Sequence, residues 1–140
     1  MLAVLSLGSN LGDREFYIRE AKTQLESRVG HLTKLSPVME TQSWGYDSHD
    51  YLNQVLEIDT PLLPEDLLHE LKKIEIDLGR DPETKTKNGT QDYKDRTIDI
   101  DILYYENVSM NTPELTIPHP QIVHRPFIQE LLDAMKNLNY

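Results

Sequence analysis

The order of the periodic segments along this chain predicts an α+β fold with an antiparallel sheet. Short apolar or alternating runs, which are typical of strands, occur at four places, and two amphipathic segments with helical spacing lie among them. No internal repeat, low-complexity tract or interdomain linker interrupts the pattern. With 140 residues, of which 38% are hydrophobic, the chain is long enough for one core and too short for two, so we expect a single domain over residues 1–140.

The N-terminal part is predicted to begin with a buried strand and an amphipathic helix. Residues 2–7 form a short apolar run that ends at a glycine-bearing turn. Apolar residues then recur at helical spacing between positions 18 and 29, and Gly30 is suited to end the helix. Either Asn10 or Asp13 is placed to cap the first turn, because both side chains accept hydrogen bonds from free backbone N–H groups.

Two further strands are predicted before the second helix. Residues 31–40 favour a strand in which Pro37 marks an edge or a bulge, since proline has no N–H group to donate to a sheet. Residues 51–59 alternate cleanly, so Tyr51 and Asn53 share the face of the strand that does not enter the core.

The second helix is the clearest element of the sequence. Pro64 suits its first position, apolar residues recur between positions 67 and 78, and Gly79 follows the last of them. Residues 81–95 are polar and contain the turn-forming pair Asn88-Gly89. They predict a long loop, and loops of this length in compact domains tend to be lids or binding loops.

A strand over residues 98–105 and a short helix over residues 126–138 complete the pattern. The resulting order of strand, helix, strand, strand, helix and strand is that of ferredoxin-like β-α-β-β-α-β sandwiches. We therefore expect four antiparallel strands with both main helices on one face of the sheet. Because many unrelated functions share this fold, function has to be argued from the site residues.

Composition excludes several classes of function. The net charge of −10 counts against nucleic acid as a partner, because proteins that bind it need a basic surface. No apolar run is long enough to cross a bilayer, and the first residues lack the pattern of a secretion signal, so we expect a cytoplasmic protein without a membrane partner. The absence of cysteine excludes disulfides, thiolate metal sites and cysteine nucleophiles.

A pair of aspartates on the last predicted strand is the strongest functional signal. Asp99 and Asp101 are two residues apart, so their side chains project from the same face of a strand. Two neighbouring carboxylates repel each other unless a cation lies between them, and hard oxygen ligands of this kind suit Mg²⁺. Arg96, just before the strand, is a natural phosphate ligand for the same complex. The alternative is a solvent-facing strand that carries two aspartates by chance, although aspartate is depleted in strands.

Two other clusters contain residues that bind phosphate or flat rings. His119 lies between two prolines and Arg125 follows six residues later, so both could be held to contact phosphate, or the segment could simply be a proline-rich turn. Tyr51 and Asn53 offer an aromatic plane beside an amide, which suits a flat heterocycle. The same pair is also compatible with an ordinary polar sheet face.

In this order, these segments resemble the 6-hydroxymethyl-7,8-dihydropterin pyrophosphokinase family. The resemblance covers nearly the whole chain, and the aspartate segment followed by the Pro-His-Pro segment is its most specific part. The matching segments are Gly8-Ser9-Asn10-Leu11-Gly12, Tyr51-Leu52-Asn53, Arg96-Thr97-Ile98-Asp99-Ile100-Asp101, and Pro118-His119-Pro120 with Arg125 and Phe127.

The resemblance implies a monomeric enzyme of folate biosynthesis that transfers pyrophosphate from ATP to 6-hydroxymethyl-7,8-dihydropterin and releases AMP. Carried over by position, Asp99 and Asp101 would hold two Mg²⁺ ions with ATP. Asp99, Asp101, Arg80 and Arg96 would be the catalytic residues. ATP would be bound by Arg80, Arg96, His119 and Arg125. The pterin would contact Thr41, Trp44, Tyr51, Asn53 and Phe127, stacking between the Tyr51 and Phe127 rings. Glu75 matches a family position near the active site.

The chain departs from the family pattern in the long loop. The family usually has Trp-Gly-Pro before the arginine of the metal-binding strand, whereas this chain has Tyr93-Lys94-Asp95. A second arginine, two positions beyond the one that matches Arg80, is replaced by Pro82, and the loop is several residues longer. Two alternatives therefore stay open: a non-catalytic ferredoxin-like module that binds a ligand or partner, and a diverged family member that transfers slowly.

Overall fold

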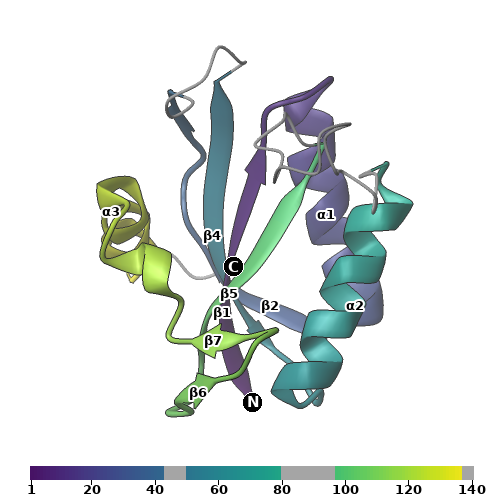
Figure 1. Ribbon diagram of the computed structural model, residues 1–140. Helices are drawn as coiled ribbons and strands as arrows, with labels where there is room; N and C mark the ends of the chain where they lie inside the picture. The colour runs from purple at the N-terminus through teal and green to yellow at the C-terminus, as the bar shows by residue number, and fades with distance from the viewer. Residues whose placement is uncertain (43–49, 80–96, 137–140) are drawn as a thin grey trace, which may run out of the picture.

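The computed structural model describes residues 1–42, 50–79 and 97–136. Its main sheet is covered by two long helices on one face and by a shorter helix on the other (Figure 1). The strands of this sheet are β1 (Leu2–Ser9), β2 (His31–Leu35), β3 (Met39–Thr41), β4 (Tyr51–Asp59) and β5 (Asp99–Tyr105). The helices are α1 (Arg14–Arg28), α2 (Pro64–Asp77) and α3 (Pro126–Met135).

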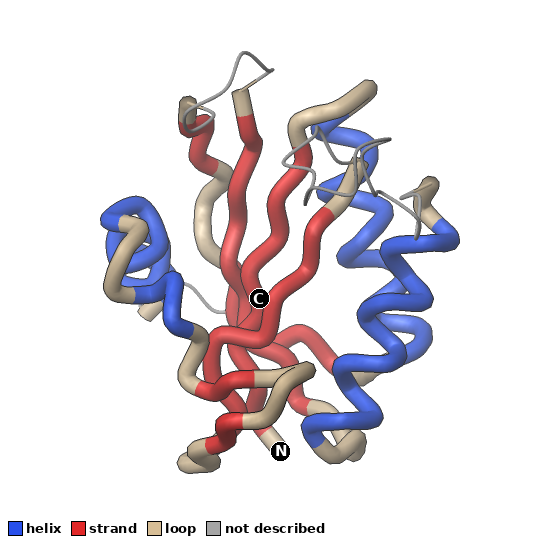
Figure 2. The backbone as a smooth tube through the Cα atoms, viewed as in Figure 1, coloured by secondary structure: helices blue, strands red, loops and turns tan. Residues whose placement is uncertain are grey.

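The strand β1 occupies the centre of the sheet. The strands lie side by side (Figure 2) in the order β2-β4-β1-β5, with β3 pairing the remaining length of β4. Every pairing in the sheet is antiparallel. The predicted mixed fold with an antiparallel sheet is confirmed. Because β1 pairs β4 on one side and β5 on the other, residues from three distant segments of the chain meet across it.

The alternation of side chains divides the core between the two faces of the sheet. Ala3, Leu5 and Leu7 of β1 pack beneath α1 and α2, together with the apolar stripe of α2. Val55 and Leu103 on the opposite face pack against α3. The first helix is capped by Asp13, one of the two residues predicted for that role, whose Oδ1 accepts the Phe16 N–H at 3.1 Å.

The strand expected over residues 31–40 is divided in two. Leu35 pairs Leu56 and Met39 pairs Asn53. The chain therefore advances four residues between β2 and β3 while the facing part of β4 advances three. Ser36 bridges the interruption, because its N–H donates to Val55 O at 2.9 Å and its Oγ accepts the Val55 N–H at 3.0 Å. Pro37 lies in this interruption, where a residue without an N–H group does not break a strand pairing. A further register shift within β2 lies between Leu32 and Lys34.

The segment after β5 contains structure that the sequence pattern did not indicate. A two-stranded ribbon, β6 (Met110–Asn111) with β7 (Thr116–Ile117), precedes a 3₁₀ turn, η1 (Pro120–Ile122). The short helix predicted next is present as α3. Within the residues that the structure describes, no helix is long and apolar enough to span a bilayer.

Candidate active site

The pairing of β1 with its two neighbours places the predicted site residues in one row. Gly8 pairs Asn53 of β4 and also pairs Asp99 of β5. Side chains at paired positions of an antiparallel sheet lie on the same face, so the row presents an amide, a residue without a side chain, and a carboxylate. Asp101 lies in the next row, opposite Ser6. The aspartate pair of β5 and the Asn53 region of β4, which are far apart in the sequence, are therefore neighbours on one face of the sheet.

The backbone between the two aspartates is held from both of its edges. On one edge β5 pairs β1, while on the other the Ile100 N–H donates to Glu75 Oε2 at 2.7 Å. Glu75 belongs to α2 and only 6% of its surface is exposed. The aspartate side chains project to the opposite face from Ile100, which packs in the core beneath the helices. The Glu75 carboxylate thus fixes the position of the strand segment that carries Asp99 and Asp101.

A backbone hydrogen bond holds His119 beside the same site. Its N–H donates to Leu103 O at 3.0 Å, which attaches the segment to the outer edge of β5. The imidazole Nδ1 accepts the Gln121 N–H at 3.1 Å, and Nε2 lies 3.9 Å from Asp101 Oδ1. Because Nδ1 must keep its lone pair to accept this bond, the neutral ring carries its proton on Nε2, on the side of Asp101.

The electrostatic surroundings favour the neutral form of this histidine. Burial lowers the pKa of His119, and the Arg125 guanidinium lowers it further, while the Asp99 carboxylate acts in the opposite direction. Arg125 and Asp99 are therefore both within electrostatic range of the imidazole. The lowered pKa of His119 favours an imidazole that donates from Nε2 near Asp101 without carrying a formal charge.

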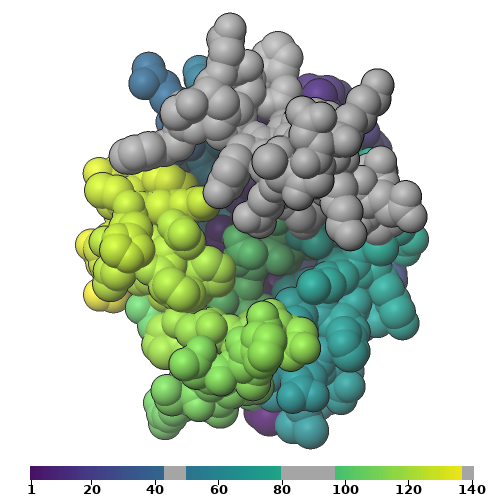
Figure 3. All heavy atoms as spheres, in the orientation of Figure 1, coloured from purple at the N-terminus to yellow at the C-terminus, as the bar shows by residue number. Residues whose placement is uncertain are grey.

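The first turn of α3 contributes two of the predicted residues. Arg125 is the N-cap residue of α3 and is exposed. Phe127, one residue after the proline that begins the helix, packs with the cluster of Val55 and Leu103 on the same face as the row of site residues. In the space-filling view, a hollow lies between yellow atoms of α3 and green atoms around β5, and purple atoms of the N-terminal segment show at its bottom (Figure 3).

Asn53 is held in a defined orientation. It is 8% exposed, and its Nδ2 donates to Thr41 Oγ1 at 2.7 Å and lies 3.4 Å from Met39 O. Thr41 in turn pairs Tyr51 across the β3–β4 pairing. Three of the residues predicted to contact the pterin, Thr41, Tyr51 and Asn53, are thereby brought together at one end of β4.

Several predicted site residues lie outside the described part of the chain. These are Arg80, Arg96 and Trp44, together with the loop predicted over residues 81–95. The residues that flank this part are neighbours, since a Cβ atom on Gly79 would stand 3.8 Å from Thr97 Cγ2. Gly79 and Thr97 are therefore close to each other beside the start of the strand that carries the aspartates.

The contact between Glu75 and β5 was not predicted from the sequence, although a signal for it was present. Glu75 follows Leu71 by four residues and Ile74 by one, which puts an acidic side chain on the buried stripe of α2. A carboxylate on an apolar helix face needs a hydrogen-bond partner, so its position indicates a buried polar contact. The identity of that partner depends on the tertiary structure alone.

Comparison with known proteins identifies the family of the chain. Residues 4–137 match the family described as 7,8-dihydro-6-hydroxymethylpterin-pyrophosphokinase (HPPK). A 2-amino-4-hydroxy-6-hydroxymethyldihydropteridine pyrophosphokinase of Porphyromonas gingivalis is 45% identical over 130 residues, which cover 91% of this chain and 86% of the relative. The enzyme of the same name from Aquifex aeolicus is 39% identical over 136 residues, covering 96% of this chain and 80% of the relative.

Solved structures support the fold. The crystal structure of Plasmodium falciparum HPPK-DHPS superposes with a TM-score of 0.63 at 16% identity, over 96% of this chain and 39% of that longer chain. At this level of identity the likeness concerns the fold only. With the family match across nearly all of its length and relatives at 39–45% identity, the chain belongs to the 7,8-dihydro-6-hydroxymethylpterin-pyrophosphokinase family and is a pyrophosphokinase of folate biosynthesis.

Proposed function

We propose that this chain transfers the pyrophosphate group of ATP to 6-hydroxymethyl-7,8-dihydropterin and releases AMP. The observation that carries the proposal is the row of Asn53, Gly8 and Asp99. It puts groups suited to a heterocycle and groups suited to a metal–phosphate complex on one face, with a single glycine between them. A transferase for these two substrates needs both kinds of group within reach of one reacting oxygen.

Asp99 and Asp101 are the residues that would hold Mg²⁺, with two ions accompanying ATP. Their chemistry fits the ion, since both offer carboxylate oxygens from one face of a strand. Among the described residues there is no group of three or more His, Cys, Asp or Glu side chains that could hold a metal by itself. A pair of carboxylates suits an ion that completes its coordination with substrate phosphates and water. When bound, Mg²⁺ supplies neutralisation of phosphate charge and orientation of the transferred group.

The phosphates would be contacted by cationic groups and by the neutral histidine. His119 presents Nε2–H on the side of Asp101, where it can donate to a phosphate oxygen without adding a formal charge. Arg125, at the start of α3, is exposed and within electrostatic range of that imidazole. We assign Arg80 and Arg96 to the same complex as catalytic residues, on the basis of the family pattern.

The pterin would lie on the side of the row formed by β4. Asn53 offers Oδ1 and Nδ2 to a ring edge, and its bond to Thr41 holds the amide in place. We assign the ring faces to Tyr51 and Phe127, and part of the edge to Trp44, again by family position. In this arrangement the hydroxymethyl oxygen attacks the β-phosphorus, the bond from that phosphorus to the α-phosphate oxygen breaks, and AMP leaves. The hydroxyl proton is released during the attack, and we assign no general base.

We extend the proposal to the finer description of the molecule. The sheet order β2-β4-β1-β5, with α1 and α2 on one face, supports a ferredoxin-like arrangement in which β3 extends the pairing of β4. A single domain, a monomer, a cytoplasmic location and a long catalytic loop after α2 are parts of the same proposal. Neither nucleic acid nor a membrane is a proposed partner, on the basis of the net charge of −10 and the sequence pattern.

An assay of AMP release tests the proposal. We expect AMP to form only when ATP, Mg²⁺ and the hydroxymethyl-pterin are all present, in equal amounts with the diphosphorylated pterin. Binding of both ligands without AMP formation would identify a non-catalytic module. Formation of ADP or free phosphate in place of AMP would contradict transfer of a pyrophosphate group.

A further inference from the structure

Arg14, the first residue of α1, connects this helix to both strands that carry the predicted pterin-binding residues. Its Nη1 donates to Asp50 O at 2.8 Å and lies 2.8 Å from Glu40 Oε2. Glu40 belongs to β3, and Asp50 directly precedes β4. A single guanidinium therefore joins two paired strands to the start of a helix that comes from another part of the chain.

The residues that Arg14 contacts are the chain neighbours of the predicted pterin-binding residues. Glu40 directly precedes Thr41 in β3. Asp50 directly precedes Tyr51, and Tyr51 pairs Thr41. Thr41 Oγ1 accepts the bond from Asn53 Nδ2 at 2.7 Å. A shift of this end of β3 would therefore move the acceptor that orients the Asn53 amide.

Arg14 reaches these strands from the face opposite the row of site residues. Glu40 pairs Leu52, and Leu52 packs in the core beneath α1 and α2. Paired residues of an antiparallel sheet share a face, so the Glu40 side chain points to the helices. Since neighbouring residues of a strand alternate, Thr41 points to the site. Any effect of Arg14 on the site has to pass through the two strands.

We propose that Arg14 is a positioning residue for the pterin side of the site, acting through Glu40 and the Asp50 carbonyl. The strand β3 is only three residues long, so its pairing with β4 supplies few backbone hydrogen bonds. A contact that orders this end before the ligand arrives lowers the cost of ordering on binding. The inference rests on the proposed assignment of Thr41, Tyr51 and Asn53 to the pterin.

The exposure of the contact predicts a local effect with little change in global stability. The side chains of Arg14 and Glu40 are 30% and 53% exposed. Exposed ion pairs contribute little to folding, so Arg14→Met should keep a melting temperature within about 3 °C of the wild type. Loss of substrate affinity without loss of stability would separate positioning from a merely structural role.

Calorimetry on the full chain provides the test. Pterin affinity would be measured with saturating Mg²⁺ and a non-hydrolysable ATP analogue, and analogue affinity by itself. Arg14→Met keeps the aliphatic stem and removes the guanidinium, so it should lower pterin affinity by about threefold or more. Analogue affinity should stay within about twofold. Arg14→Lys keeps the charge without the planar fork and should recover about half of the lost affinity.

Two further variants make the comparison specific. Arg19 is the matched control on the same helix, since its guanidinium lies 5.8 Å from the centre of the Phe16 ring. Arg19→Met should leave both affinities within about twofold of the wild type. Glu40→Gln removes the ion pair and keeps the bond to Asp50 O. It should weaken pterin binding less than Arg14→Met does, and by less than about twofold in an Arg14→Met background.

The possible outcomes distinguish the role of Arg14 from the pterin assignment. A loss of pterin affinity below about threefold in Arg14→Met, an equal loss of analogue affinity, or full additivity with Glu40→Gln would overturn the inference. Asn53→Ala is measured in the same way. If Asn53→Ala weakens pterin binding and Arg14→Met does not, the assignment stands and only the role of Arg14 fails. Unchanged pterin affinity in Asn53→Ala would overturn the assignment, and the inference with it.

Discussion

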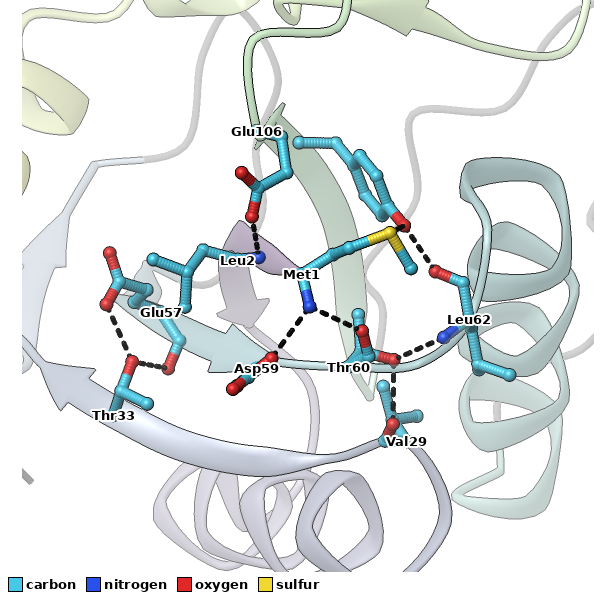
Figure 4. A network of polar contacts seen from close by, with 10 residues as sticks. Met1, Leu2, Val29, Thr33, Glu57, Asp59, Thr60, Leu62 and Glu106 are labelled. Carbon is cyan, nitrogen blue, oxygen red and sulfur yellow. Dashed lines mark hydrogen bonds and ion pairs between the residues drawn. The ribbon is translucent and has the colours of Figure 1, made fainter.

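The two ends of the main sheet differ in whether their buried polar groups are hydrogen-bonded. At the end that carries Met1 and Thr60, polar atoms bond to one another (Figure 4). The Met1 amino group donates to Asp59 Oδ1 at 2.8 Å and to Thr60 O at 2.9 Å. The Thr60 hydroxyl is buried, donates to Val29 O at 2.8 Å and accepts the Leu62 N–H at 3.1 Å. These bonds connect β1, β4, α1 and the start of α2.

The opposite end contains the candidate site and leaves buried polar atoms unmatched. Within the described parts of the chain, the buried side-chain atoms that lack a hydrogen-bond partner are Ser9 Oγ, Gln54 Oε1 and Thr97 Oγ1. Ser9 ends β1, Thr97 precedes β5, and Gln54 pairs Leu7 near the same end. Each unmatched atom costs about 1–3 kcal/mol. The comparison teaches that polar groups close one end of the sheet by bonding to one another, whereas the end that carries the candidate site retains, among the described residues, buried polar atoms without partners. Ser9 and Gln54 lie on the face that packs beneath the helices, opposite the row of site residues.

The largest effect is expected from the aspartates of the site. Asp99→Asn and Asp101→Asn should each lower the rate of transfer by about a hundredfold or more, because they remove a charged oxygen ligand from the proposed Mg²⁺ site. Asp59→Asn is the matched control at the other end of the sheet. It should keep full activity and lose at most about 1 kcal/mol of stability, since its ion pair is exposed. Near-normal turnover in either site variant would contradict the metal assignment.

A smaller and more selective effect is expected from Asn53. Asn53→Ala should weaken pterin binding by about 1–3 kcal/mol, because a buried ring edge would lose its hydrogen-bond partner. Binding of an ATP analogue should change little. Thr41→Val removes the acceptor that orients the amide and should give a weaker loss of the same kind. Equal losses for both ligands in calorimetry would argue against a pterin site at Asn53.

Glu75 is bonded to the strand that carries the aspartates, so its substitution should affect both the stability of the fold and the Mg²⁺ requirement of the site. Glu75→Ala leaves the Ile100 N–H without its acceptor and should lower the free energy of unfolding by about 1–3 kcal/mol. Because the aspartates flank Ile100, the variant should also need more Mg²⁺ for half-maximal activity. Glu75→Gln keeps an acceptor oxygen and should restore most of the stability. If the Mg²⁺ requirement of Glu75→Ala stays at the wild-type value, the role of Glu75 is structural only.

The smallest effect is expected at the end of the sheet that carries Met1 and Thr60. The Tyr105 hydroxyl donates to Leu62 O at 2.6 Å, and burial, assisted by the Glu106 carboxylate, raises its pKa. Tyr105→Phe should lower stability by about 0.5–1.5 kcal/mol and leave turnover unchanged.

The pH dependence of stability checks the same residue. A raised pKa means that the folded state favours the neutral phenol. Its contribution is therefore fully present below the usual tyrosine pKa of about 10 and is lost as the pH rises through the folded value. Chemical unfolding of the wild type and Tyr105→Phe between pH 8 and 11 (a range of about one to two units on either side) should show the difference shrinking at the alkaline end. A constant difference would contradict the raised pKa.

Local properties of this chain could be predicted from the sequence because they depend on neighbouring residues. The period-two alternation puts Asp99 and Asp101 on one face of a strand, and the helical spacing before Gly79 predicts α2. The same reasoning offered Asp13 as one of two possible caps, and the structure confirms it. It also marked Pro37 as an edge or a bulge, and the proline lies where the strand predicted around it is interrupted. Each of these features involves residues within a few positions of one another.

The assembly of the site depended on contacts that no local pattern specifies. Alternation tells which face a side chain occupies, but the pairing register decides which residues of other strands lie beside it. The register places Gly8 between Asn53 and Asp99, and the packing of α2 brings Glu75 to the Ile100 N–H. The backbone bond from His119 to Leu103 likewise fixes the imidazole beside Asp101. The residue types and their faces follow from the sequence itself, whereas their neighbours follow from long-range pairing and packing, because those contacts join segments far apart in the chain.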